Sequence, residues 1–219
     1  MIRDLADNFP ATTLSPHFNA VYDMVVNELN GLTSEQLDFE SDEWEWSKWS
    51  IRRQVSHMAS LHFRWILQRW GQYLFPDGLP AIEDLNDLIS SPNDRRLNEK
   101  KYWEIASILR KLREAIELTH SIFSSETIGS LREKEIARDS PSNWKIMAQA
   151  HPRGIRWDSA KNPTVSYITL EATIRHMYFE DITHLYNIQR LKRAQDLVCV
   201  VVLPNEGYWV LPDWDRSEP

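Results

Sequence analysis

Apolar residues recur every three or four positions in several stretches of the chain, which is the spacing that buries one face of an α-helix. The first stretch begins with Ser15 as a cap and Pro16 at the first helical position, and Gly31 ends it. Further stretches lie at 50–73, 98–123 and about 164–195, with a weaker one at 80–90. The pattern predicts four long helices.

The segment between the third and fourth expected helices, 124–163, lacks this periodicity. Pro141, Pro152, Gly154 and Pro163 interrupt it. So long an irregular stretch inside a compact domain is usually either functional or partly disordered. We therefore expect an insertion that covers a site.

The segment after the fourth expected helix is rich in β-branched residues and predicts two short strands. They lie within 197–212 and are joined by a three-residue turn that ends at Gly207. The expected fold class is all-α: a four-helix bundle with a long irregular insertion before the last helix and a short C-terminal β-hairpin at 196–219. One domain over 1–219 accounts for the whole pattern.

Composition excludes several classes of function. The chain has 219 residues, 42% hydrophobic residues and ten tryptophans, which is typical of a globular protein. A formal charge of −7 argues against nucleic-acid binding, and neither the first residues nor the longest apolar run resembles a signal peptide or a membrane span. The single cysteine, Cys199, is expected to be a core residue. We expect a soluble, cytoplasmic protein with no nucleic-acid or membrane partner.

The six glycines are too dispersed for a dinucleotide-binding or P-loop motif, and no G-x-S-x-G sequence is present. Candidate chemistry lies instead in "HMYFEDITHLYN", where His176, Glu180 and His184 follow at intervals of four, with Asn187 three residues later. Four residues advance an α-helix by roughly 400°, so these side chains lie one above another. The spacing suits a shared ligand and equally suits a polar surface stripe.

The second expected helix carries two histidines, on different sides. His62 lies on the apolar side, and His57 lies on a narrow polar strip that also holds Arg53 and Arg64. Taken alone, the helix favours an exposed His57 and a packed His62. The polar strip could instead line a wet cavity inside the bundle.

The run "WSIRRQVSHMASL" resembles the first motif of the DinB/YfiT-like family of metalloenzymes, in which a Trp-Ser helix start is followed seven residues after the serine by a metal-binding histidine. That position is His57 here. The second motif of the family is a pair of histidines four apart on the last long helix, with a glutamine three residues beyond. His184 matches the second histidine, whereas Glu180 replaces the first and Asn187 replaces the glutamine.

The resemblance implies a divalent metal, zinc, nickel or iron(II), held by His57, Glu180 and His184. Two imidazoles and one carboxylate are an accepted ligand set for such ions. The carboxylate lowers the net charge of the site by one unit and so weakens the metal as a Lewis acid. His176, one turn before Glu180, is expected to be a supporting or surface residue rather than a fourth ligand.

The resemblance also implies an activity and partners. Characterised members include transferases and isomerases that use low-molecular-weight thiols, so a small-molecule substrate, a thiol and a homodimer are expected. Trp49 precedes the cap of the second helix and is expected to anchor its entry, and Trp44 or Trp46 could form an apolar wall beside the substrate. No catalytic residue beyond the metal ligands is assigned.

Two other interpretations remain. A di-iron carboxylate site needs two Glu-x-x-His pairs and two further glutamates. Glu117-x-x-His120 and Asp181-x-x-His184 resemble such pairs, but the helix at 50–73 contains no acidic residue. The second alternative is a non-catalytic helical binding protein that has lost its metal through the change to Glu180.

Overall fold

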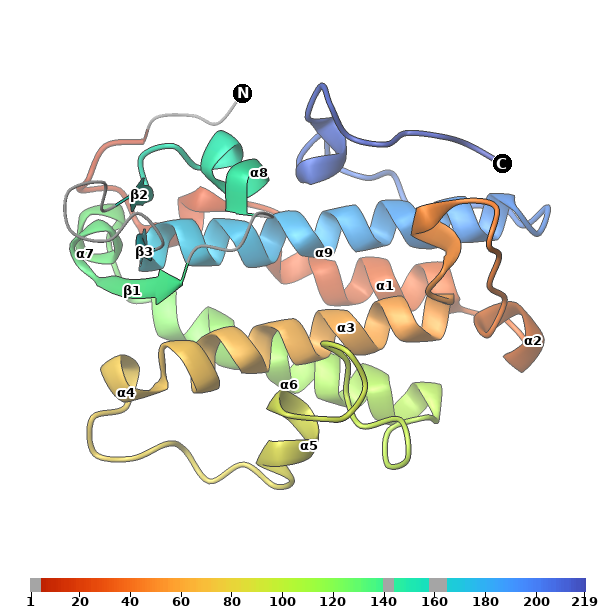
Figure 1. The fold of residues 1–219 in the computed structure, drawn as a ribbon, viewed down its shortest axis with the longest axis horizontal. Coiled ribbons are helices and arrows are strands. Elements are labelled where there is room, and N and C mark those ends of the chain that lie inside the picture. Colours follow the sequence, from red (N-terminus) through yellow and green to blue (C-terminus); the bar gives the residue numbers. More distant parts are fainter. Residues whose placement is uncertain (1–4, 140–143, 158–164) are drawn as a thin grey trace.

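Four long helices that pack side by side form the body of the protein (Figure 1). The computed structural model describes residues 5–139, 144–157 and 165–219. The long helices are α1 (Val21–Leu29), α3 (Ile51–Phe63), α6 (Ile105–Phe123) and α9 (Leu170–Arg193). Helix α3 contacts both α6 and α9, and α1 contacts the same two, so that α3 and α9 lie next to each other.

Capping residues set where the two central helices begin. The Ser50 hydroxyl accepts a hydrogen bond from the Arg53 amide at 3.4 Å, and the Thr169 hydroxyl accepts one from the Ala172 amide at 3.1 Å. These bonds satisfy amides that the first turn of a helix leaves unpaired. Both helices bury most of their side chains, polar ones included, because each is covered on several sides.

The second expected helix, 50–73, changes its geometry after Phe63. A π-helix, η4 (Arg64–Arg69), continues α3, and the amide of Trp70 donates to the carbonyl of Trp65 at 3.0 Å, across five residues. Shorter helices connect the long ones. They are α2 (Ser34–Leu37), α4 (Gly71–Leu74), α5 (Leu85–Ile89), α7 (Ile128–Glu133) and α8 (Trp144–Ala150), with 3₁₀ turns at Ala11–Leu14, Phe18–Ala20, Glu45–Ser47 and Tyr208–Val210.

A three-stranded antiparallel sheet lies at the start of α9 (Figure 1). Its strands are β1 (Glu135–Asp139), β2 (Ile155–Trp157) and β3 (Val165–Thr169), in the order β1-β3-β2. Strand β3 continues directly into α9, and the amide of Leu170 donates to the carbonyl of Lys134 at 3.0 Å. The segment 124–163 is therefore structured where it is described, and 140–143 and 158–163 lie outside the described residues.

The expected C-terminal hairpin is not formed. Residues 197–207 form no strand, and the amides of Val200 and Val201 donate to the Glu28 carboxylate at 3.1 and 2.8 Å. A side chain from α1 thus takes the place of a partner strand. Gly207 has φ of +100°, as expected for a turn glycine, but its backbone packs against the Phe179 carbonyl of α9.

The prediction of an all-α four-helix bundle with a C-terminal hairpin is therefore wrong. The chain is mostly helical, but it contains the β1-β3-β2 sheet and many short helices between the long ones. The sheet was missed because its strands have only three to five residues and pair across turns and a helix. Within the described ranges, no helix has both the length and the apolar character that crossing a membrane requires.

Candidate metal centre

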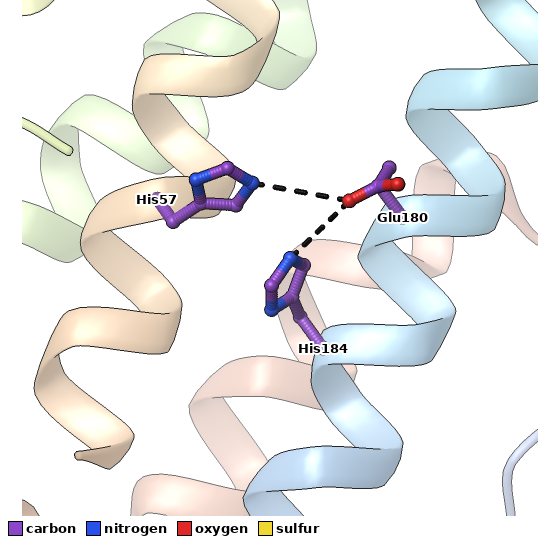
Figure 2. A group of neighbouring side chains, drawn as sticks. All are labelled: His57, Glu180 and His184. Atoms are coloured by element: carbon purple, nitrogen blue, oxygen red, sulfur yellow. Dashed lines mark ion pairs between the residues drawn. The ribbon is translucent and has the colours of Figure 1, made fainter. Parts of the chain in front are cut away.

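Three side chains from two helices meet between α3 and α9. The Nε2 atom of His184 lies 3.4 Å from Oε2 of Glu180, and Nε2 of His57 lies 3.9 Å from the same oxygen (Figure 2). One nitrogen or oxygen from each residue lies within 4.8 Å of the others. The structure therefore brings together the three residues that the sequence proposed as ligands, in a group that could hold a metal ion.

The two helices explain this convergence. Helix α9 carries Glu180 and His184 four residues apart, so both side chains project from one line along its surface. Helix α3 presents His57 from the opposite side. The two imidazoles are buried and the carboxylate is partly exposed, so solvent reaches the group chiefly at Glu180.

Hydrogen bonds fix the protonation of both imidazoles. The Nδ1 atom of His57 lies 3.0 Å from the Arg95 carbonyl, and Nδ1 of His184 bonds to the side-chain oxygen of Gln54. The amide nitrogen of Gln54 donates to two backbone carbonyls, at 3.3 and 3.2 Å, which orients the oxygen of Gln54 toward His184. Both Nδ1 atoms must therefore carry a proton, so in the neutral tautomer of each imidazole the lone pair lies on Nε2.

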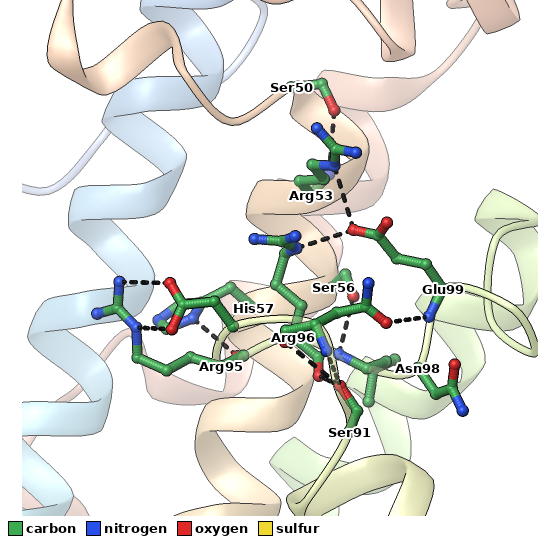
Figure 3. Close-up of polar contacts among 12 residues, drawn as sticks. Ser50, Arg53, Ser56, His57, Ser91, Arg95, Arg96, Asn98 and Glu99 are labelled. Atoms are coloured by element: carbon green, nitrogen blue, oxygen red, sulfur yellow. Dashed lines mark hydrogen bonds and ion pairs between the residues drawn. The ribbon is translucent and has the colours of Figure 1, made fainter.

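The loop 91–99 supplies the carbonyl that holds His57 (Figure 3). Arg95 adopts φ of +56°, a left-handed conformation that is uncommon for a residue with a side chain. The loop is fixed to α3 on its other side, because the amide of Leu97 donates to the Ser56 hydroxyl at 3.1 Å. Backbone strain of this kind persists only where surrounding contacts enforce it.

The charges of the group favour a cation. Burial and the adjacent His184 lower the pKa of His57 to about 3, so this imidazole is neutral at neutral pH. Burial acts to raise the pKa of Glu180, but its contacts with His184 and His57 prevail and hold that pKa well below the ordinary value. A carboxylate and two imidazole Nε2 atoms thus face a common point.

The spacing also fits an ion. Two ligand atoms, each about 2.1 Å from a tetrahedral ion, lie roughly 3.4 Å apart. The separation between His184 and Glu180 has this value, and that between His57 and Glu180 is somewhat wider. The bonds to both Nδ1 atoms match the pattern that orients metal-binding histidines. The residues present therefore fit a divalent metal.

His176 lies next to this group and is held by a different residue. Its Nδ1 atom is 4.0 Å from Oε1 of Glu180 and 2.7 Å from the Tyr208 hydroxyl. Burial lowers the pKa of His176 to about 4, although the charge on Glu180 acts in the opposite direction. The tyrosine contact makes His176 a neighbour of the carboxylate rather than a member of the three-residue group.

A cavity of about 420 Å³ lies beside the three residues. Its volume suits a small molecule. The cavity is lined by residues from α3, η4, α8, α9, the loop 91–99, strand β1 and the C-terminal segment: Trp49, His57, Leu61, Arg64, Trp65, Arg69, Arg95, Arg138, Ile146, Met147, His176, Glu180, Thr183, His184, Asn187, Tyr208 and Trp214.

Two of the residues proposed from the sequence do not line this cavity. Arg53 forms an ion pair with Glu99 at 3.1 Å (Figure 3) and another with Glu40 at 2.6 Å. The Trp46 indole nitrogen donates to the Ser217 hydroxyl at 3.0 Å. Arg53 therefore ties together the surface around the start of α3, and Trp46 anchors the C-terminal segment.

The structure also separates the residues of the di-iron alternative. Glu117 and His120 line a different cavity, between α1 and α6. Asp181 turns away from His184 and its Oδ2 atom lies 2.9 Å from Nε2 of His62. No shared two-metal site can be built from these pairs as they lie in the structure.

Comparisons with known proteins identify no relative of this chain. Neither the family models nor the curated proteins nor the solved structures contain a match to this chain. The family resemblance in the motifs around His57 and His184 stays a prediction.

Sequence reasoning missed several residues that line the cavity. Arg64 was placed on the polar strip of His57 but given no role, and Arg69, Arg138 and Tyr208 were not considered. Arg64 follows His57 by seven residues, which is two helical turns, and this spacing was a usable signal. Tyr208 and Arg138 come from distant segments, and no local pattern connects them with α3.

Proposed function

We propose that this protein is a divalent-metal-dependent enzyme that acts on a small molecule in the cavity between α3 and α9. The observation that carries the proposal is the arrangement of acceptors: Nε2 of His57, Nε2 of His184 and Oε2 of Glu180 face one another, and both Nδ1 protons are used elsewhere. Such an arrangement is unfavourable without a cation. A divalent ion relieves it.

His57, Glu180 and His184 would hold the ion, and the cavity on the open side of the group would admit substrate. A bound divalent metal supplies a Lewis acid that lowers the pKa of a coordinated water or thiol. The Arg95 carbonyl and the Gln54 side chain keep the two imidazoles in the required tautomer. Tyr208, whose pKa burial raises well above its ordinary value, stays protonated and positions His176.

The resemblance to the DinB/YfiT-like family suggests the reaction. A thiol-dependent transfer or isomerisation needs a thiolate near neutral pH, and a metal in this group would favour that form. A low-molecular-weight thiol and a second small molecule would then share the cavity. Metal analysis of the purified protein would show both whether a metal is present and whether it is zinc, nickel or iron(II).

The test is the metal content of protein purified without an affinity tag. We expect about one divalent ion per chain in the wild type, because three protein ligands plus solvent complete a common coordination shell. Glu180→Gln should contain much less metal, since a neutral amide oxygen is a poorer donor than a carboxylate. Glu180→His should retain metal and shift the preference toward ions that favour nitrogen.

His62→Gln is the control, because it removes a histidine from α3, the helix of His57, but outside the three-residue group. Its metal content should equal that of the wild type. Full occupancy in Glu180→Gln would show that the carboxylate is not a required ligand. Absence of metal from the wild type, together with failure to take up added zinc, nickel or iron(II), would overturn the proposal. The alternative, a non-catalytic helical binding protein without a metal, would then be favoured.

A further inference from the structure

Positive charge gathers at the cavity of an otherwise acidic protein. Four arginines line it, Arg64, Arg69, Arg95 and Arg138, and among the described lining residues Glu180 supplies the one carboxylate. The chain as a whole has a formal charge of −7. Of the four, Arg95 is paired with Asp94 at 3.3 Å.

The indole of Trp65 organises two of these guanidinium groups. The Cζ atom of Arg69 lies 4.2 Å from the ring centroid of Trp65, and that of Arg138 lies 4.8 Å from it. Trp65 is buried, and His176 packs edge-on against it with 5.1 Å between ring centroids. The indole therefore connects the arginines to the neighbourhood of Glu180.

The π-helix explains how Arg64 and Arg69 come to line the same cavity. In an α-helix, residues five apart differ in direction by roughly 140°. In η4 the turn closes over five residues, as the bond from the Trp70 amide to the Trp65 carbonyl shows, and this brings such residues toward one side. The local geometry, which is rare in proteins, thus adds a second cation to the site.

In the part of the chain that the structure describes, Arg69 has no anionic partner. Its guanidinium makes no ion pair with a described residue, whereas Arg53, at the start of α3, has two. Burial and the charge of Arg138 lower the pKa of Arg69 to about 9. The hydrogen bonds of Arg64 to described residues are long: 3.3 Å to the Ser60 hydroxyl and 3.4 Å to the Arg95 carbonyl.

We propose that the cavity binds a small molecule through an oxyanion, a carboxylate or a phosphate, that Arg64 and Arg69 hold. The planar guanidinium group binds such oxyanions with two parallel hydrogen bonds. This inference rests on the proposed function in one respect. The end of the substrate opposite the oxyanion would face the metal held by His57, Glu180 and His184. The oxyanion would supply Arg69 with the anionic partner that the described residues do not provide.

The experiment is calorimetric titration with inorganic phosphate and, separately, with succinate. Both are titrated at low chloride and constant ionic strength into the protein as purified and into the same protein after chelation. Chelation matters because phosphate can also ligate a metal. We expect saturable binding of at least one of the two anions in both preparations, and the anion that binds more tightly identifies the oxyanion.

Variants at position 69 locate the binding. Arg69→Gln should lower the affinity for the anion at least about tenfold, as expected for the loss of a charged hydrogen bond. The variant should keep its metal content. Arg69→Lys, which keeps the charge but not the fork, should weaken it less. Arg113→Gln is the matched control, since Arg113 lies on α6 over the ring of Tyr22, beside a different cavity, and its removal should change nothing.

A structural role for Arg69, limited to its contact with Trp65, predicts a different result: a melting temperature that falls equally with and without the anion. Binding of neither anion by the wild type, or equal affinity in Arg69→Gln, would overturn the proposal. The metal test is independent. Anion binding by a protein that takes up no metal would leave this inference standing and remove the proposed function, and a metal-loaded protein that binds neither anion would do the reverse.

Discussion

Helices α3 and α9 carry two groups of acidic and imidazole side chains, and the two groups differ in one respect. His57, Glu180 and His184 form the open group, beside the cavity. His62 and Asp181, joined by Thr119 of α6, form the sealed group, in which the side chains of His62 and Asp181 are fully buried. In both groups an imidazole uses Nδ1 as a donor and directs Nε2 at a carboxylate oxygen.

The distances separate the two groups. Nε2 of His62 lies 2.9 Å from Oδ2 of Asp181, which is a hydrogen bond with one shared proton. In the open group the corresponding distances are 3.9 and 3.4 Å. A proton cannot bridge these acceptors well, whereas an ion about 2 Å from each can. The same pair of residue types is therefore structural where it closes on a proton and suited to a metal where it stays apart.

The largest expected effect is the loss of protein stability when the sealed group is broken. His62→Gln should lower the free energy of unfolding by about 3 kcal/mol, because Asp181 loses its buried partner. The same substitution at His57 should cost only about 1 kcal/mol in metal-free protein, the value of one neutral hydrogen bond. Urea denaturation of both variants after chelation measures the difference. If both variants lost the same free energy of unfolding, the open group would also be a structural contact.

Metal should stabilise only proteins with an intact open group. At a free metal concentration one hundred times the dissociation constant, the wild type should gain about 2.7 kcal/mol, because the ion binds the folded state. His62→Gln should gain a similar amount and His57→Gln almost none. Thermal unfolding with and without added metal tests this, and a full gain in His57→Gln would place the ion elsewhere.

The open group should also make the metal-free protein sensitive to acid. The pKa of His57 is lowered to about 3, and an unfolded histidine titrates near 6.5. As pH falls through 6.5, the unfolded state takes up a proton that the folded state refuses, so stability is lost between 6.5 and 3. At pH 5 this amounts to about 2 kcal/mol.

Denaturation of metal-free wild type and His57→Gln at pH 7 and pH 5 isolates that contribution. The loss between the two pH values should be smaller in the variant. A variant that loses as much stability as the wild type would show that His57 is already protonated in the folded protein.

The smallest effect concerns the loop that holds His57. Arg95→Asn keeps the carbonyl on Nδ1 and accepts the left-handed φ of +56° more readily, so stability should change by less than about 1 kcal/mol. Metal content should be unchanged. A loss of metal in Arg95→Asn would mean that the guanidinium, and not the carbonyl, supports the open group.

The sequence predicts the elements that depend on local spacing. The four long helices follow from apolar periodicity and from caps such as Ser50, and the stacking of Glu180 over His184 follows from their separation by four residues. His57 was added to them by the family resemblance alone. Metal binding by these residues, like the homodimer and the cytoplasmic location, stays a prediction.

Elements that depend on contacts between distant segments were missed. The hairpin was wrong because Glu28, on α1, binds the amides that a partner strand would have used. The β1-β3-β2 sheet and the π-helix have no strong local pattern. The Nδ1 partners of the open group, the Arg95 carbonyl and Gln54, follow only from how the loop 91–99 and α3 pack, so the tautomers could not be read from the residues.

The most direct measurement is the anomalous X-ray signal of crystals grown from protein loaded with zinc, collected on both sides of the metal absorption edge. The account predicts one strong peak about 2 Å from Nε2 of His57, Nε2 of His184 and a carboxylate oxygen of Glu180, and no peak between His62 and Asp181. A peak held by other residues, or zinc-loaded crystals without a peak between α3 and α9, would contradict it.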